Sequence, residues 1–433
     1  MNARDSSQRT SPSSVLPSGE GLVVWVLWLT YGSFYFCRTN IAVAVPGMEA
    51  EFGFTKTQIG SILGALKLAY GIGQLVNGQL AERFSPRLLL AIGMLASATL
   101  NVVFGLSTGL YFLLFVWAMN GYCQALGWTP CMRVAANWFP VSRRGRRIGV
   151  IGTGYQLTAA LTYVVSGAAA DAFGWRFAFY IPAVVLVASC VHMFVYLEER
   201  PRDGAALAPP TDDGEPVSDG AVAAARRSFA ANVALTLSNP VLWFLALALG
   251  LLNACRYGFL DWGITHLYEV QGETVGKAAI KYAVLPLGGI VGAYASGWAS
   301  DRFFASRRTP VIFILLCLLG VLTLLYSHCV QAGTSWTLVV LTFVGFAIYG
   351  PQVLLVGTAP VDAARGGTSA AAVGFVNFMG YMGAYAGDRV TGSLADASAD
   401  WQVPLYFWAS CAFAAALLVA FLWYAEARKE RKE

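Results

Sequence analysis

The sequence has 433 residues, of which 57% are apolar and 12% charged, and its formal net charge is +5. Soluble globular proteins carry about 25% charged residues, and disordered chains combine low hydrophobicity with high charge. The chain therefore fits neither class. A helix of about 20 apolar residues crosses a bilayer, and the chain has room for about twelve such spans.

Apolar runs alternate with breaks that are charged or rich in Gly and Pro. After a polar N-terminus (1–21), six spans are predicted at about 22–46, 58–81, 88–107, 111–136, 147–171 and 176–197. A polar stretch at 198–239 is typical of a solvated linker. Six more spans are predicted at about 240–268, 276–300, 309–328, 336–358, 367–393 and 402–425, before a charged tail (426–433). This pattern predicts an all-α membrane protein with two six-helix bundles, at 22–197 and 240–425.

Basic residues gather on one side of the predicted bundle. With twelve spans, the following residues share that side: Arg83, Arg87, Arg143, Arg144, Arg146, Arg147, Arg200, Arg202, Arg226, Arg227, Arg302, Arg307, Arg308, Arg428, Lys429, Arg431 and Lys432. The other side carries little beyond Lys56, Arg176 and Lys277. By the positive-inside rule, both termini and the linker are expected in the cytoplasm, in a multi-pass protein of the cytoplasmic (inner) membrane. The N-terminus lacks the pattern of a signal peptide.

Two short sequence elements recur at nearly the same separation. GQLAER (78–83) is matched by GWASDR (297–302), 219 positions later, and GAAADA (167–172) is matched by GSLADA (392–397), 225 positions later. The matches indicate a duplicated bundle, and parallel repeats of this kind place a site between the two halves at the membrane midplane. We expect Glu82 with Arg83, and Asp301 with Arg302, to form a gating latch that can break. The alternative is that they are ordinary charges at helix ends.

Two arginines lie inside apolar spans at the same separation. Arg38 lies late in the first span and Arg256 late in the seventh, 218 positions apart. Ionisable groups inside a span are costly and usually functional. Two guanidinium groups that converge between the bundles are stable only with an anion, and their planar forks match phosphate or carboxylate. The alternative for each is an arginine that snorkels from near a helix end.

Tyrosines and further charges share helix faces with these arginines. Three rows have helical spacing: Tyr31, Tyr35 and Arg38; Lys67, Tyr70 and Gln74; and Tyr381, Tyr385 and Asp388, with Arg389 adjacent. They predict a polar cavity that favours anions, although a single tyrosine row is also typical of packing or of an interfacial belt. Asp388 and Arg389 can pair with each other or with other helices. Asp261 and Arg133 are expected in ion pairs within their own bundles, and the three histidines at the membrane interface.

Motifs for enzymatic chemistry are missing from the sequence. It has no G-x-x-x-x-G-K-[ST] loop, no H-E-x-x-H and no G-x-S-x-G, and none of its eight cysteines forms a CxxC pair. We therefore expect no enzyme activity, no metal and no cofactor. The expected partners are the lipid bilayer and a small anionic substrate, not nucleic acid. Transport must then be driven by gradients or by exchange.

Three strings resemble signatures of the major facilitator superfamily and, within it, of the organophosphate:phosphate antiporters. They are GWTPCMR (127–133) followed by Trp138, RYGFLDW (256–262) and YGP (349–351). The resemblance covers the chain from about Val24 to Tyr424. It implies the major facilitator fold and exchange of an organic phosphate for inorganic phosphate by alternating access.

The resemblance also implies roles for individual residues. Arg38 and Arg256 match the pair that holds the phosphoryl group. The cavity tyrosines of the glycerol-3-phosphate exchanger are matched by Tyr31, Tyr35, Tyr70, Tyr349 and Tyr381. The chain departs from that exchanger at three positions, where a lysine is replaced by Gln74, a histidine by Tyr155 and a glutamate by Pro286. Lys67 lies on the same helix face as Gln74 and can restore the missing charge. The Asp388–Arg389 pair resembles charged eleventh-span residues of hexose-phosphate relatives, so a larger phosphorylated sugar or acid is expected in place of glycerol-3-phosphate.

Two other functions fit the same residues. One is a transporter-like sensor of sugar phosphate that signals to a membrane histidine kinase, as some members of the family do. The other is a proton-coupled carrier of a non-phosphate organic anion, with Asp388 as the proton site. In each case we expect the protein to act as a monomer.

Overall fold

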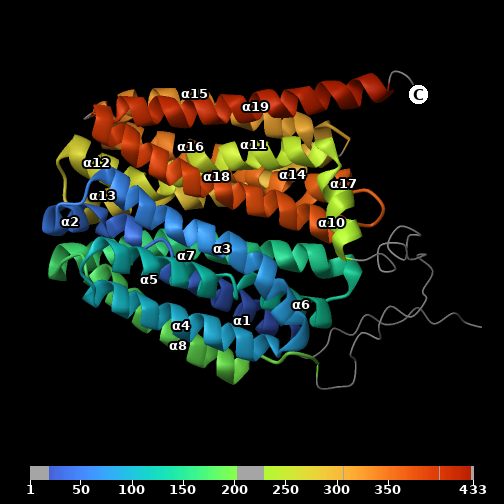
Figure 1. Ribbon diagram of the computed structural model, residues 1–433, viewed down its shortest axis with the longest axis horizontal. Coiled ribbons are helices and arrows are strands. Elements are labelled where there is room, and N and C mark those ends of the chain that lie inside the picture. Colours follow the sequence, from blue (N-terminus) through green and yellow to red (C-terminus); the bar gives the residue numbers. More distant parts are fainter. Residues whose placement is uncertain (1–18, 202–228, 306, 399, 431–433) are drawn as a thin grey trace, which may run out of the picture.

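The computed structural model describes residues 19–201, 229–305, 307–398 and 400–430, and its regular elements in these ranges are helices (Figure 1). Eleven of the described helical segments are long and apolar enough to cross a membrane. Helix α18 (Ser369–Ser398) runs beside them over 30 residues, although its glycines and the adjacent Asp388 and Arg389 lower its hydropathy. The predicted all-α fold with twelve spans is confirmed.

The N-terminal half is the lower, blue-to-green part of Figure 1. Its elements are α1 (Glu20–Ser33), η1 (Phe34–Cys37), α2 (Ile41–Phe52), α3 (Lys56–Arg83), α4 (Pro86–Leu106), α5 (Leu110–Gln124), α6 (Trp128–Trp138), α7 (Val141–Phe173) and α8 (Phe177–Tyr196). Residues 1–18, which make up most of the expected polar N-terminus, lie outside the described residues. The first span reaches Phe52, beyond its predicted end.

The C-terminal half is the upper part of Figure 1. Its elements are α10 (Phe229–Leu237), α11 (Pro240–Tyr257), η2 (Gly258–Trp262), α12 (Gly263–Gln271), α13 (Val275–Tyr282), α14 (Val284–Phe303), α15 (Thr309–Gln331), α16 (Thr334–Val353), η3 (Leu354–Thr358), α17 (Ala359–Ala363), α18 and α19 (Gln402–Glu430). Helix α10 occupies the end of the expected linker, whose residues 202–228 lie outside the described ones. Helix α19 continues through much of the expected tail.

The duplication is visible in the turns that precede α3 and α13. Gly53 ends α2 with φ 66° and Gly272 ends α12 with φ 64°, the left-handed conformation that glycine adopts without strain. Two residues later, Thr55 and Thr274 accept hydrogen bonds from the first turns of α3 and α13. Both pairs are separated by 219 positions, the same separation as the GQLAER and GWASDR elements.

The first and seventh spans are interrupted near their arginines. In the first span, the 3₁₀ segment η1 separates α1 from α2, and Arg38 follows it directly. In the seventh, Arg256 lies in the last turn of α11, just before the π-helical segment η2. π-Helical segments are frequent at functional sites, and broken helices at equivalent places in two repeats mark transporter binding sites.

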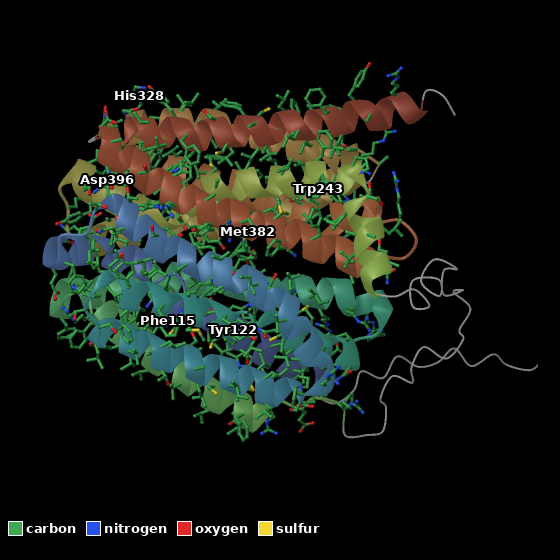
Figure 2. The ribbon with its side chains drawn as sticks, viewed as in Figure 1. Phe115, Tyr122, Trp243, His328, Met382 and Asp396 are labelled. Carbon is green, nitrogen blue, oxygen red and sulfur yellow. The ribbon has the colours of Figure 1, made fainter. Side chains whose placement is uncertain are left out.

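Helices α3 and α18 hold the two halves together over much of their length (Figure 1). A Cβ atom on Gly60 would lie 2.5 Å from the Asp388 carbonyl oxygen, and one on Gly392 would lie 2.1 Å from that of Lys56. We call the left-hand end of Figure 1, with α12 and α13, the distal end, and the right-hand end, with α10, the proximal end. Figure 2 places Asp396 of α18 at the distal end and Met382 near the middle of the same helix.

Candidate functional site

Arg38 is surrounded by tyrosines of both halves. It is 6% exposed, and its guanidinium carbon lies 4.0 Å from the ring centre of Tyr70 and 5.2 Å from that of Tyr35. Its Nη2 donates a hydrogen bond of 3.5 Å to the hydroxyl of Tyr381 on α18. Cation–π contacts of this kind stabilise a buried guanidinium. These contacts do not use all five N–H donors of the guanidinium group, so some of them can bind a further acceptor.

Arg256 has a matching environment in the other half. It is 3% exposed, and its guanidinium carbon lies 4.8 Å from the ring centre of Tyr257 and 5.1 Å from that of Tyr349. Its Nε has no hydrogen-bond partner within the described residues. Buried polar groups are almost always satisfied, so the geometry leaves a donor that an anion can use. Both arginines are buried among protein side chains, whereas a snorkelling arginine extends its charged group into water.

A chain of tyrosine rings connects the two arginines. Tyr31 and Tyr35 have ring centres 6.0 Å apart, Tyr35 stacks on Tyr155 at 5.0 Å, and Tyr155 lies 6.2 Å from Tyr349. Tyr70 and Tyr381, from opposite halves, are 4.7 Å apart. The structure thus brings together six of the tyrosines that the sequence placed at the site. The seventh, Tyr385, lies against α3 instead, where a Cβ atom on Gly64 would be 2.9 Å from its ring.

Lys67 forms an ion triad with two carboxylates of the other half. Its Nζ lies 2.7 Å from Asp388 and is also hydrogen-bonded to Asp261. All three residues are buried, and Lys67 also contacts the ring of Tyr257, with Nζ 5.0 Å from its centre. Tyr257, which also touches Arg256, therefore connects the triad to the arginine pair. The prediction that Asp261 pairs within its own bundle was wrong, because its partner is on α3.

The charges of the arginine pair and the triad do not balance. Arg38, Arg256 and Lys67 carry three positive charges, and the two carboxylates of the triad carry two negative ones. One formal positive charge therefore remains among buried groups, where charge is costly without a partner. The arrangement favours a bound anion.

The remaining predicted site residues lie outside this cluster or at its edge. Gln74 donates to the Tyr70 hydroxyl at 3.0 Å and so supports a ring that faces Arg38. Arg389 is exposed and points away from Asp388 and its partner Lys67, because neighbouring residues of a helix point about 100° apart.

Two other residues, Arg133 and His266, differ in their contacts from the expected roles. The Arg133 guanidinium donates to the backbone carbonyls of Ala81 and Phe84, and the predicted ion pair is not seen among the described side chains, which do not include that of Glu82. His266 is 1% exposed and packs against Tyr326 and Trp401, so it is a core residue and not an interfacial one.

One of the residues expected in the latch, Asp301, makes an ion pair with another residue of its own half. Asp301 pairs with Arg308 at 2.7 Å within the C-terminal half, and the Arg308 Nε lies 3.9 Å from Asp362. Arg83 and Arg302 are exposed. The side chain of Glu82 lies outside the described ones.

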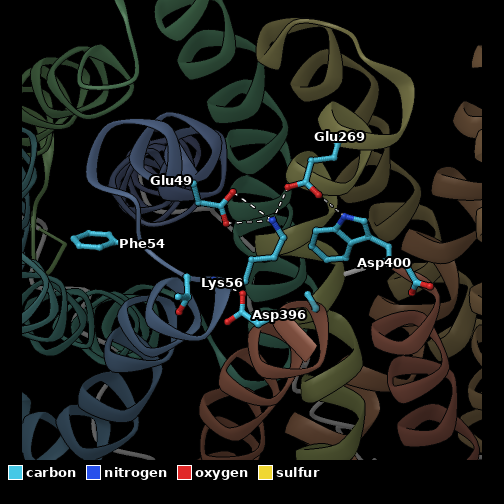
Figure 3. Close-up of a pocket in the computed structure, with 9 residues that line it drawn as sticks. Glu49, Phe54, Lys56, Glu269, Asp396 and Asp400 are labelled. Atoms are coloured by element: carbon cyan, nitrogen blue, oxygen red, sulfur yellow. Dashed lines mark hydrogen bonds and ion pairs between the residues drawn. The ribbon is translucent and has the colours of Figure 1, made fainter. Parts of the chain in front are cut away.

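A cavity of about 370 Å³ lies at the distal end, between the halves (Figure 3). Lys56 of α3 projects into it, 2.6 Å from Glu269 of α12 and 3.5 Å from Glu49 of α2. Asp396 of α18 lies below the same lysine in Figure 3. These charges have no sequence signal that assigns them to a site, apart from the place of Asp396 in one of the repeated elements.

Comparison with known families identifies the architecture. A family model described as the Major Facilitator Superfamily matches residues 27–388. The chain belongs to the Major Facilitator Superfamily. It is thus a multi-pass membrane protein, and the match includes both halves and both arginines.

Relatives within the Major Facilitator Superfamily cover nearly the whole chain. A probable hexose phosphate transport protein of Chlamydia trachomatis is 31% identical, over 95% of this chain and 92% of its own length. The glycerol-3-phosphate transporter of Bacillus subtilis is 28% identical, over 93% and 92%. The membrane sensor protein UhpC of Salmonella typhimurium is 29% identical, over 84% and 82%. The resemblance to organophosphate carriers seen in the sequence is confirmed.

Solved structures of two transporters share the fold at low sequence identity. A bacterial homolog of the human lysosomal transporter Spinster, in an inward-facing and unoccupied conformation, superimposes with a TM-score of 0.73 at 16% identity, over 95% of this chain and 96% of that one. The nucleoside transporter NupG gives a TM-score of 0.68 at 14% identity, over 94% and 98%. At these identities the likeness concerns the fold alone.

Proposed function

We propose that the protein is a secondary transporter that moves a phosphorylated organic anion across the membrane in exchange for inorganic phosphate. The observation that carries the proposal is the arginine pair. Arg38 and Arg256 occupy equivalent places in the two repeats, both are buried among tyrosines, and the Nε of Arg256 has no partner among the described residues. Relatives named for hexose phosphate, glycerol-3-phosphate and phosphoglycerate support this class of substrate.

The proposed mechanism uses one anion that contacts both halves. Each guanidinium fork donates to the phosphoryl oxygens, so the bound anion offsets the remaining positive charge and draws the halves together. An empty carrier leaves donors of both guanidinium groups unsatisfied and reorients poorly. A ligand shifts a conformational equilibrium only if it binds one conformation more tightly than the other. Here the anion binds most tightly when the two halves have closed around it, so the carrier changes sides only when loaded, and this couples the outward flux of one anion to the inward flux of the other.

The substrate we propose is larger than glycerol-3-phosphate. Gln74, Tyr155 and Pro286 replace three polar or charged residues of the glycerol-3-phosphate exchanger, and Lys67 is engaged by the two carboxylates of the triad. A phosphorylated sugar or acid can use the tyrosine hydroxyls for its remaining oxygens. One chain carries both arginines, so the mechanism needs no second copy.

We also propose an orientation in the membrane. The proximal end carries the arginine-rich loops, which the positive-inside rule assigns to the cytoplasm. The termini and the linker then face the cytoplasm in the inner membrane, and the distal end faces outward. In this orientation the predicted latch residues Glu82, Arg83, Asp301 and Arg302 belong to the cytoplasmic gate.

Phosphate counterflow in liposomes tests the proposal. The variants Arg38→Lys and Arg256→Lys keep the charge but lose the planar fork. We expect each to lower the exchange rate by at least about tenfold, the loss of one hydrogen bond to a charged group. Arg200→Lys, which changes an exposed arginine at the start of the linker, is the matched control and should exchange as the wild type does.

Two results would count against phosphate exchange. Full activity of both lysine variants would reject the bidentate clamp. Uptake that follows a pH gradient without internal phosphate would instead favour the proton-coupled carrier, with buried Asp388 as its proton site.

A second candidate function is sensing. It is favoured by the match to a membrane sensor protein at 29% identity, close to that of the named transporters. The proposed partner is then a membrane histidine kinase. Sugar-phosphate binding to the purified protein without flux in liposomes would favour the sensor over the transporter.

A further inference from the structure

Two aspartates at the distal end occupy equivalent positions in the repeats and reach across to the opposite half. Asp171 lies near the end of α7 and Asp396 near the end of α18, in the elements GAAADA and GSLADA. Neither belongs to the arginine pair or the triad. Each binds the first turn of a helix that follows one of the matching turns described above.

Asp171 caps α13 of the C-terminal half. Its carboxylate accepts a hydrogen bond of 2.6 Å from the hydroxyl of Thr274 and one of 2.9 Å from the backbone amide of Gly276. The amides of a first helical turn have no partner within the helix. The carboxylate therefore satisfies one of them and also faces the positive end of the helix dipole.

Asp396 makes the same arrangement in the opposite direction, on α3 of the N-terminal half. It accepts hydrogen bonds from the backbone amides of Lys56 and Thr57, at 2.9 and 2.8 Å, and from the Thr57 hydroxyl at 2.6 Å. Figure 3 shows its carboxylate close to the backbone of this first turn. Thr57 and Gly276, which donate to the two aspartates, are themselves 219 positions apart.

Glycines one turn earlier allow the close approach. A Cβ atom on Gly167, four residues before Asp171, would lie 2.7 Å from the Cβ of Ala279 on α13. Gly392, four residues before Asp396, has even less room beside α3. The glycine and aspartate of each repeated element thus form one docking unit, in which the glycine admits the neighbouring helix and the aspartate holds its first turn.

We propose that Asp171 and Asp396 are positioning residues of the transport cycle, a symmetric pair of carboxylate caps that holds the distal end closed. Both caps join opposite halves, so both must break when this end opens. They are exposed to solvent, and water can replace the lost hydrogen bonds. The caps can therefore bias the equilibrium without locking it. The Lys56–Glu269 ion pair adds a third contact between the halves at this end.

This inference rests on one part of the proposed function, namely that the two ends of the protein open alternately. Hydrogen–deuterium exchange on the full-length protein in lipid nanodiscs tests it, with Asp171→Ala, Asp396→Ala and the double variant, because asparagine would keep an acceptor oxygen and cap nearly as well as aspartate. We expect faster exchange in α13 and in the distal part of α3, together with slower exchange in the proximal parts of α3 and α18 as that end closes. The double variant should shift the ratio of the two states by about tenfold, the effect of two helix caps.

Asp400→Ala is the matched control. Asp400 accepts from the backbone amide of Gln402 at 2.8 Å and so caps α19 within its own half. Its loss should speed exchange only in the first turn of that helix. If the two cap variants likewise change only the first turns of α3 and α13, the caps are local and the proposal is wrong.

A sided transport assay gives an independent readout. Opening the distal end should lower the KM for phosphate on that side and raise it on the proximal side, whereas a merely structural defect changes both alike. If the double variant does not fold, the single variants carry the same test. Absence of exchange in the wild type would refute the proposed function, whereas wild-type behaviour of the cap variants would refute only this inference.

Discussion

Lys67 illustrates how a buried charge can be tolerated between two moving parts. Its ammonium group comes from α3, and its two carboxylate partners come from η2 and α18 of the other half. Removing three charges from water is costly, and their mutual attraction offsets the cost only while the geometry is intact. The triad therefore links the halves beside the arginine pair, and any relative movement of α3 changes its energy.

The substitution Lys67→Met should destabilise the protein strongly. It leaves two carboxylates facing each other in a buried site, and breaking a buried ion pair on one side costs about 3–5 kcal/mol. Thermal melting in detergent without phosphate should show a clear fall in Tm. Adding Asp388→Asn should restore part of it, because one of the unpaired charges is removed.

The control for this prediction is Lys277→Met, at an exposed lysine of α13. Surface substitutions usually change the free energy of unfolding by less than about 0.5 kcal/mol. Equal melting temperatures for Lys67→Met and the wild type would mean that the triad contributes nothing to stability.

The sequence predicted some of these residues and missed others for identifiable reasons. Arg38 and Arg256 were found because a charge inside an apolar run stands out and because the two share the repeat separation. The partner of Asp261 was misassigned, since helical spacing places residues on one face and cannot show which neighbouring helix meets that face. Tyr257, which touches both Arg256 and Lys67, was overlooked beside the more conspicuous charges.

Glycines allow helices to pack closely within the C-terminal half, as they do between the two halves. The contact between α11 and α18 is an example. A Cβ atom on Gly383 of α18 would lie 2.1 Å from the carbonyl oxygen of Gly250 on α11. The obstructing atom is backbone, so it cannot swing aside. Small residues at such crossings let helices approach where lipid provides no hydrophobic drive.

Gly383→Ala should therefore lower the free energy of unfolding by about 1–3 kcal/mol, the usual cost of overpacking. Gly374→Ala, on the same helix with no atom within 4 Å of the new Cβ, is the control. It should be neutral or stabilising by roughly 0.5–1 kcal/mol, since alanine is the better helix former. Melting of the two variants side by side measures the difference, and equal stabilities would contradict this account of the α11–α18 contact.

Some features of the helices could be predicted from the sequence and others could not. Hydropathy and charged breaks located the spans, because the bilayer imposes a length on every crossing helix. The interruptions at η1 and η2 were not predicted, since they depend on contacts between helices and not on local propensity. Helix α10 was taken for linker because a nine-residue helix is too short to register as a span.

The two halves carry complementary parts of one electrostatic unit. The N-terminal half contributes Arg38 and Lys67, and the C-terminal half contributes Arg256 and both carboxylates of the triad. One formal positive charge remains when they meet. A dianion between the halves reverses the sign of this imbalance and also satisfies the guanidinium donors, so binding and closing of the halves are thermodynamically linked.

Ligand binding should accordingly stabilise the protein against heat. A ligand that binds the folded state adds about 2.7 kcal/mol to the free energy of unfolding at a hundred times its Kd. We expect inorganic phosphate and a sugar phosphate to raise Tm, and the parent sugar or sodium chloride at equal ionic strength to have little effect. Arg256→Gln should abolish the shift, because it removes the fork with the unpartnered Nε while leaving the triad in place. A shift of equal size in this variant, or one that chloride reproduces, would show that phosphate acts elsewhere on the protein.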